Sequence, residues 1–309
     1  MNSFSNLALD LSRHASPLFG KLSRLKFDWM KTVRDLVARA NKEAANTVSI
    51  IGIDGTTLLG EWTPIAGSSH VRTICDRWPV QQYRKMYVHG PETLGLKVPS
   101  RISEVLSGMY SMGVGDFVLI GYSRGCHIAI EVAKRIEIEN TRRREVFELL
   151  TGPGALGLDA RDIGPFRPIR VRALGLFDAV DRELFNNTQQ IPRIVENTYH
   201  AIRSPEVGSR SQFGNTGVVQ NGNWYESEVF AATHAGMGGL PWMGDHPVRT
   251  VPLRLSNGLI LGVTKEPTIT EEQDRQASSA VFEWMWPRLQ LHRVITTDSP
   301  LGLQCSALV

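Results

Sequence analysis

The sequence of 309 residues predicts an α/β protein built on a mainly parallel sheet with helices on its flanks. Short apolar runs rich in β-branched residues alternate with segments of helical periodicity, which is the pattern of βαβ units. Several of these runs stop at Asp, Gly or Ser, the residue types expected where strands end at the functional edge of such a sheet. Apolar residues make up 42% of the chain and charged residues 21%, which is enough to build a sizeable core.

The predicted strands cover residues 48–53, 85–88, 116–121 and 169–177. Apolar spacings of three and four predict helices over residues 99–112, 126–138 and 271–291. A pair of short strands is expected within 251–263, around Asn257-Gly258. The segment 186–243 is rich in Gly, Asn and Ser, so we expect it to contribute long loops over one edge of the sheet.

Residues 1–46 read as a separate helical extension, followed by the α/β domain over residues 47–309. Leu22, Leu25, Trp29 and Val33 recur at helical spacing, with lysines and arginines between them. An amphipathic basic helix of this kind packs on its domain with a solvated charged face, or it lies on an anionic membrane surface. We favour packing on the domain and keep peripheral membrane contact as the alternative.

The overall composition argues against several classes of protein. With 34 basic and 31 acidic residues, the net charge of +3 is too small to predict a nucleic-acid partner. Three scattered cysteines do not predict a disulfide framework or a zinc site, and we expect neither a metal nor a cofactor. The chain has no apolar run of 18 residues and no signal peptide. We therefore expect a cytoplasmic protein, which a non-classical secretion system could export.

The sharpest motif is Gly121-Tyr122-Ser123-Arg124-Gly125, which matches the pattern G-x-S-x-G. The pentapeptide alone is weak evidence, because a chain of this composition contains it by chance fairly often. Its context is stronger, since it lies directly between a predicted buried strand and a predicted helix. In that setting the pattern predicts a nucleophile elbow and hence an α/β-hydrolase fold, with Ser123 as the nucleophile.

A serine nucleophile needs a base and an acid that orients the base, and in this fold they follow in the order Ser, acid, His. Asp178 directly ends the strand 169–177, and Asp181 is its competitor one turn later. His234 is the preferred base, because a strand-like run, 229–233, precedes it and a glycine-rich loop follows. His200 and His246 remain alternatives.

The oxyanion of an acyl-transfer reaction needs two backbone N–H donors. Arg124 follows the nucleophile and supplies the first, and Gly55 or Thr56 at the end of the first strand is expected to supply the second. Asp54 and Tyr122 flank these positions and are candidates for contact with the substrate.

Two phosphate-transfer patterns compete for residues 52–56. The D-x-D-G-T motif of haloacid-dehalogenase phosphatases needs an aspartate where Gly52 stands, and the G-I-D-x-G-T-T turn of sugar kinases is one residue short here. The chain also lacks the phosphate loop G-x-x-x-x-G-K-[ST], so we disfavour both interpretations.

Together the motifs resemble the α/β-hydrolase domain of type VI secretion phospholipase effectors, a domain long catalogued as one of unknown function. The family segments D-G-T, Y-x-x-G-x-G-T, G-[FY]-S-R-G, G-V-W-D-T-V and G-V-H-x-D-V-G-G correspond to residues 53–56, 87–93, 121–125, 174–180 and 230–239. The resemblance implies a phospholipid or other lipid ester as substrate and no metal.

The chain departs from this family pattern at several positions. Glu92 replaces a family glycine, and Gly236 replaces the aspartate two residues after the histidine. The family's Y-H-A segment is present as residues 199–201, but of the following D-E-x-R only Glu206 and Arg210 offer counterparts. The expected function is hydrolysis of lipid acyl esters by Ser123, His234 and Asp178. A carboxylesterase of small soluble esters and a non-catalytic binding protein on the same scaffold are the alternatives.

Overall fold

A computed structural model describes residues 48–55, 69–91, 97–113, 115–151, 166–180, 190–207, 217–219, 221, 224–241, 253–254, 260–261 and 268–293. The predicted N-terminal extension, residues 1–46, lies outside this part of the chain. So do Thr56 and the alternative acid and base, Asp181 and His246.

The centre of the molecule is a six-stranded sheet in the order β2-β1-β3-β4-β5-β6. Every pairing within it is parallel, which confirms the α/β prediction. The strands are β1 (Val48–Ile53), β2 (Lys85–Val88), β3 (Asp116–Tyr122), β4 (Arg170–Phe177), β5 (Asn197–Arg203) and β6 (Trp224–Phe230). The strand order reverses between β1 and β3, and in open parallel sheets the carboxyl end of such a switch point is where ligands bind.

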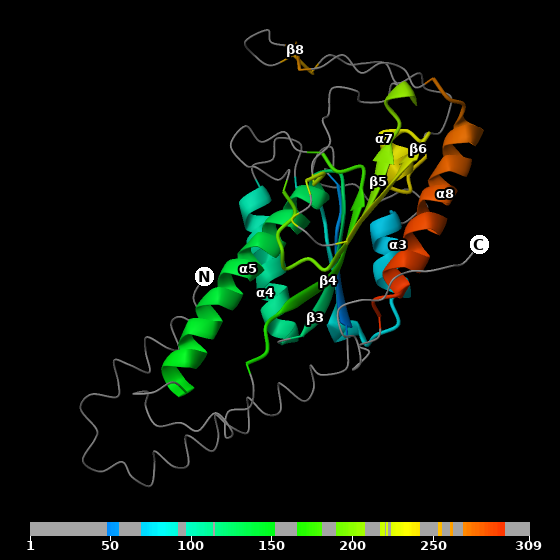
Figure 1. The fold of residues 1–309 in the computed structure, drawn as a ribbon. Coiled ribbons are helices and arrows are strands. Elements are labelled where there is room, and N and C mark those ends of the chain that lie inside the picture. Colours follow the sequence, from blue (N-terminus) through cyan, green and yellow to red (C-terminus); the bar gives the residue numbers. More distant parts are fainter. Residues whose placement is uncertain are drawn as a thin grey trace, which may run out of the picture.

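Helices cover both faces of the sheet (Figure 1). The first face carries α4 (Val98–Met112) and α5 (Arg124–Thr151), and the opposite face carries α3 (His70–Arg77) and α8 (Glu271–Gln290). A single turn of helix, α7 (His234–Met237), follows β6. Outside the main sheet, β7 (Leu253–Arg254) pairs antiparallel with β8 (Ile260–Leu261), which agrees with the strand pair predicted there.

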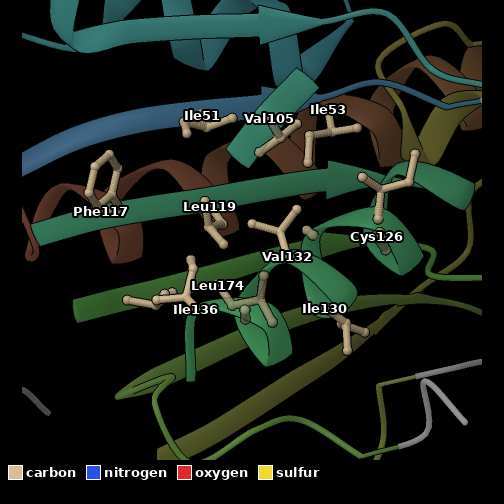
Figure 2. Close-up of a cluster of buried hydrophobic side chains, with 14 of the residues drawn as sticks. Ile51, Ile53, Val105, Phe117, Leu119, Cys126, Ile130, Val132, Ile136 and Leu174 are labelled. Atoms are coloured by element: carbon tan, nitrogen blue, oxygen red, sulfur yellow. The ribbon is translucent and has the colours of Figure 1, made fainter. Parts of the chain in front are cut away.

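The helices on each face are held to the sheet by apolar side chains that project from both faces of the central strands. Every residue of β1 and of β3 is buried, which explains why these strands read as continuous apolar runs rather than alternating ones. On the first face Ile51 and Leu119 from the sheet pack with Val105 of α4 and Ile130 of α5 (Figure 2). The second face uses a separate cluster to which α3 and α8 contribute.

The segment 186–243, expected to form loops, contains two strands of the main sheet, so that prediction was wrong for these residues. β5 reads as polar because it carries Asn197, Thr198 and His200, although most of the strand is buried. β6 is an edge strand whose residues are half-buried or exposed, and it therefore lacks the apolar run of a central strand. Both strands obtain their order from pairing with neighbours, which local periodicity does not reveal.

Two helices also differ from the prediction. α3 was not predicted, because its buried face is short; Ser69 caps it by accepting the N–H of Arg72. α5 continues to Thr151, well past the predicted end at residue 138, because its second half is largely exposed and polar and shows little apolar periodicity.

We expect Leu119→Ala, in the middle of β3, to lower the free energy of unfolding by about 2–5 kcal/mol, since it opens a cavity between the sheet and α5. Leu149→Ala, at a position that is 72% exposed on α5, should change it by no more than about 0.5 kcal/mol. Urea denaturation of both variants measures the difference. Equal losses would contradict the placement of β3 in the core.

Candidate active site

Ser123 lies on the tight turn between the carboxyl end of β3 and the first residue of α5, with a φ of 55°. The glycines on either side are required by close packing. A Cβ on Gly121 would lie 2.6 Å from the Cα of Cys126, and a Cβ on Gly125 would overlap the carbonyl oxygen of Ile53. The turn therefore fits between β1 and α5 only with glycine at both positions.

Asp178 follows β4 directly, as predicted, and its φ is 44°. In the described part of the chain, Ser123 and Asp178 are the two non-glycine residues with a positive φ. The backbone links the two turns, because the N–H of Ser123 donates to the carbonyl of Phe177 at 2.9 Å. Left-handed backbone at non-glycine residues costs free energy, and such strain concentrates at functional sites.

A chain of hydrogen bonds joins the three side chains that the sequence analysis selected. His234 Nδ1 lies 2.5 Å from Asp178 Oδ2, and His234 Nε2 lies 2.9 Å from Ser123 Oγ. All three side chains are buried. The alternative base is held elsewhere: His200 Nδ1 lies 3.0 Å from the hydroxyl of Tyr225.

Asp178 has a second buried partner, Arg203, at the end of β5. Arg203 Nε donates to Asp178 Oδ2 at 2.9 Å, on the same oxygen that faces His234. Burial by itself raises the pKa of Asp178, but the hydrogen bonds and charges of His234 and Arg203 outweigh it, so the pKa lies below its usual value. The sequence analysis missed Arg203. The available signal was an arginine that ends a strand-forming segment.

His234 begins α7, so the glycine-rich segment after it is not the loop that we expected. Thr233 caps this turn of helix, and its Oγ1 accepts the N–H of Gly236 at 3.0 Å. Thr233 is in turn held by Asp274 of α8, whose Oδ1 accepts the Thr233 N–H at 2.6 Å and whose Oδ2 accepts the Thr233 hydroxyl at 2.8 Å. Asp274 is fully buried.

Two further contacts fix this turn against α8 and α3. Ser278 Oγ donates to the carbonyl of Gly236 at 2.7 Å, and the His70 N–H donates to the carbonyl of Gly238 at 2.9 Å. His70 Nε2 lies 3.0 Å from the Ser278 carbonyl, which connects the two helices beneath the turn. The turn that carries His234 is therefore held by elements that lie far from it in the sequence.

Tyr122 packs beneath the site and connects its parts. Its hydroxyl donates to the carbonyl of His234 at 2.7 Å, and its ring lies 5.1 Å from the imidazole ring. A Cβ on Gly55 or on Gly238 would come within 2.6 Å of the Tyr122 ring. The side chain thus separates the end of β1 from the turn that carries the base. Its predicted contact with substrate stays a prediction.

Asp54, the other candidate for substrate contact, is also engaged within the protein. Its Oδ2 accepts hydrogen bonds from the hydroxyls of Ser69 and Tyr87, at 2.7 and 2.5 Å. Its Oδ1 accepts the N–H of Gly55 at 2.9 Å. Gly55 itself lies against Ser123, since a Cβ placed on it would be 3.1 Å from the Ser123 Cβ. Among the predicted oxyanion donors, Arg124 begins α5 and Thr56 lies outside the described residues.

Within the described residues, no cluster of three or more His, Cys, Asp or Glu side chains could hold a metal ion. The same part of the chain contains no helix with the length and hydropathy needed to cross a membrane.

Comparison with known proteins gives few matches. No family model matches the sequence, and no curated protein matches it. Among solved structures, the chain is similar to the Tle1 effector bound to the VgrG spike of the type 6 secretion system, at 16% identity and a TM-score of 0.35, over 62% of this chain and 51% of that one. It is also similar to an uncharacterized protein from Pseudomonas aeruginosa, at 10% identity and a TM-score of 0.38, over 72% of this chain and 46% of that one. The matched regions span about half the length of either protein.

We expect Asp274→Ala to lower the free energy of unfolding by about 1–3 kcal/mol, because it leaves the buried donors of Thr233 without an acceptor. Asp274→Asn keeps one oxygen for these donors and should lose less. Glu272→Ala, an exposed position on the same helix, should change stability by about 0.5 kcal/mol or less. Urea denaturation of the three variants tests this ranking. A loss for Asp274→Ala no larger than that for Glu272→Ala would show that the hydrogen bonds from Thr233 to Asp274 contribute nothing to stability.

Acid should destabilise the protein through its buried histidines. Burial lowers the pKa of His200 from 6.5 to about 4, and the nearby Asp178 charge opposes this only in part. Between pH 6.5 and pH 4 the imidazole of His200 is therefore protonated in the unfolded chain and neutral in the folded chain. The free energy of unfolding consequently falls as the pH drops towards 4. His200→Gln should reduce this slope by about 1.4 kcal/mol per pH unit. His89→Gln, at an exposed position, is the control. Denaturation curves between pH 7 and pH 4 measure the slopes, and an unchanged slope for His200→Gln would refute the expectation.

Proposed function

We propose that the protein is a serine hydrolase with an α/β-hydrolase fold, which cleaves acyl esters through Ser123, His234 and Asp178. The observation that carries the proposal is the continuous chain of hydrogen bonds from Asp178 Oδ2 through both nitrogens of His234 to Ser123 Oγ. It is supported by the strained turn that presents Ser123 at the carboxyl end of β3, between β1 and α5.

In the proposed reaction, Ser123 Oγ attacks the ester carbonyl carbon while its proton moves to His234 Nε2. Asp178 accepts the Nδ1–H of His234, which fixes the tautomer and stabilises the imidazolium that forms. The backbone N–H of Arg124 and that of Thr56 or Gly55 would hold the oxyanion; for Gly55 this requires release of its hydrogen bond to Asp54 Oδ1. His234 then returns the proton to the leaving alcohol, and a water molecule activated by the same imidazole releases the acid from the acyl-enzyme.

The substrate class that we propose is a phospholipid or another lipid ester. Its support is the resemblance of residues 53–56, 87–93, 121–125, 174–180 and 230–239 to the phospholipase effector family. For such a substrate, peripheral contact of the N-terminal extension with a membrane is the alternative to its packing on the domain, which we favour. Small soluble esters are the second candidate, because a triad of this geometry does not by itself select the alcohol.

A fluorophosphonate probe should label the wild-type protein at Ser123, and Ser123→Ala should abolish labelling. Ser123→Ala and His234→Ala should each lower kcat by about 10⁴-fold or more, since the three residues act as a unit. Ser103→Ala, at an exposed position on α4, should label as the wild type does. Mass spectrometry of the labelled peptide locates the adduct. An adduct that persists in Ser123→Ala would sink the assignment of the nucleophile.

The same preparations decide the substrate. We expect the wild type to release fatty acid from vesicles of phosphatidylcholine and phosphatidylglycerol. Turnover of a short p-nitrophenyl ester without release of fatty acid would instead indicate a carboxylesterase. A protein that neither reacts with the probe nor turns over any ester would be a binding protein on this scaffold.

A further inference from the structure

The acid of the site is bound by two groups on one oxygen atom. Asp178 Oδ2 faces both His234 Nδ1 and Arg203 Nε, at 2.5 and 2.9 Å. The Asp178 side chain is 0% exposed and that of Arg203 is 5% exposed, so solvent screens this cation little. A single carboxylate oxygen therefore lies between a guanidinium that is always charged and an imidazole that must gain a proton during the reaction.

The net charge of Asp178, Arg203 and His234 changes when His234 gains or loses a proton. With His234 neutral, Asp178 and Arg203 balance each other. When His234 takes the proton of Ser123, the three side chains together carry one positive charge. Without Arg203, the resting site would be negative and protonation would neutralise it, so proton uptake would be easier. The guanidinium thus opposes protonation of the base by solvent protons, whichever of His234 and Asp178 holds the shared proton.

We infer that Arg203 is a positioning residue that sets the proton affinity of the His234–Asp178 pair and so keeps the hydrolase active at lower pH than the same triad would be without this cation. The inference rests on the proposed function. It adds a pH range and a residue from β5 that the three-residue motif does not contain. Arg203 acts through Asp178 and has no proposed contact with the reacting atoms.

The other groups that pack around the pair in the described chain do not supply this charge. His200 of β5 and His70 of α3 are buried with their pKa values lowered to about 4, so both are neutral where the base must work. Burial raises the pKa of the Cys126 thiol well above its usual value. Tyr122 binds the His234 carbonyl through its hydroxyl, and Asp274 of α8 binds Thr233. Arg203 is therefore the cation that this neighbourhood places on the acid.

The test is the pH dependence of kcat/KM for a short soluble ester, whose acid limb reports the ionisation of the base in the free enzyme. Arg203→Gln removes the charge and should move this limb upward by about one to two pH units. Arg203→Lys keeps the charge, so its limb should stay within about half a pH unit of the wild type. The rate of fluorophosphonate labelling against pH, and the imidazole proton signals of His234 in NMR spectra, should shift in parallel.

Arg172→Gln is the matched control. Arg172 Nη1 pairs with Asp116 Oδ2 at 3.3 Å, and both side chains are nearly buried, at the opposite end of the same sheet. Its removal should lower the melting temperature and leave the acid limb unmoved.

An unmoved limb in Arg203→Gln would reduce Arg203 to a structural role and overturn the inference. A limb that moves by a full unit in Arg203→Lys would overturn it too, even if Arg203→Gln did not fold. A wild type that neither reacts with the probe nor turns over ester fails at the proposed function itself, and the inference fails with it.

Discussion

The turn at Ser123 is the constraint on which the rest of the site depends. The chain must leave β3 and enter α5 within one residue of left-handed backbone, while the turn touches β1. Glycine at 125 makes the contact with β1 sterically possible and glycine at 121 the contact with α5, because a Cβ at either position would collide with backbone. The same close approach brings the end of β1 against Ser123, and Gly55 lies there for the same steric reason. Once the turn exists, the neighbouring strands β1 and β4 bring their carboxyl ends to the serine on either side.

The buried side chains of Asp178 and His234 then need support that the turn cannot provide. A carboxylate that is wholly removed from water is unfavourable unless charge and hydrogen bonds compensate for it. Arg203 and His234 supply both for Asp178 from β5 and from the turn after β6. The base is fixed in a similar way, since Asp274 and Ser278 of α8 accept and donate the hydrogen bonds that the short helix α7 leaves open. The ends of β3 and β4 thus place Ser123 and Asp178, and hydrogen bonds from helix α8 hold the turn that carries His234.

The sequence allowed the strained parts of the site to be predicted and not the supporting parts. Ser123 and Asp178 were identifiable because each directly follows a buried apolar strand, and Ser123 also has glycines at fixed distances. Chain order left several histidines after Asp178, and His234 was preferred among them because a strand-like run, 229–233, precedes it and a glycine-rich segment follows. Arg203 and Asp274 could not be found in this way, because their partners lie 25 and 41 positions away and depend on how β5 and α8 dock. The same distinction applies to the fold: the apolar strands β1, β3 and β4 were predicted, whereas β5, edge strand β6 and helix α3 gain their order mainly from tertiary contacts.

Gly236 on the turn that carries His234 and Asp274 of α8 lie against each other. The motif that residues 230–239 resemble has an aspartate at the position of Gly236. A Cβ at this position would overlap the carboxylate oxygen Oδ1 of Asp274, so a side chain at 236 and the present position of Asp274 exclude each other. A carboxylate therefore lies beside the turn that carries His234, although residues 230–239 contain none. It comes from α8, and it holds the backbone of Thr233, immediately before the base. The absence of a side chain at 236 and the burial of Asp274 belong to one packing arrangement, in which the smallest residue on the turn admits the acidic side chain of the helix.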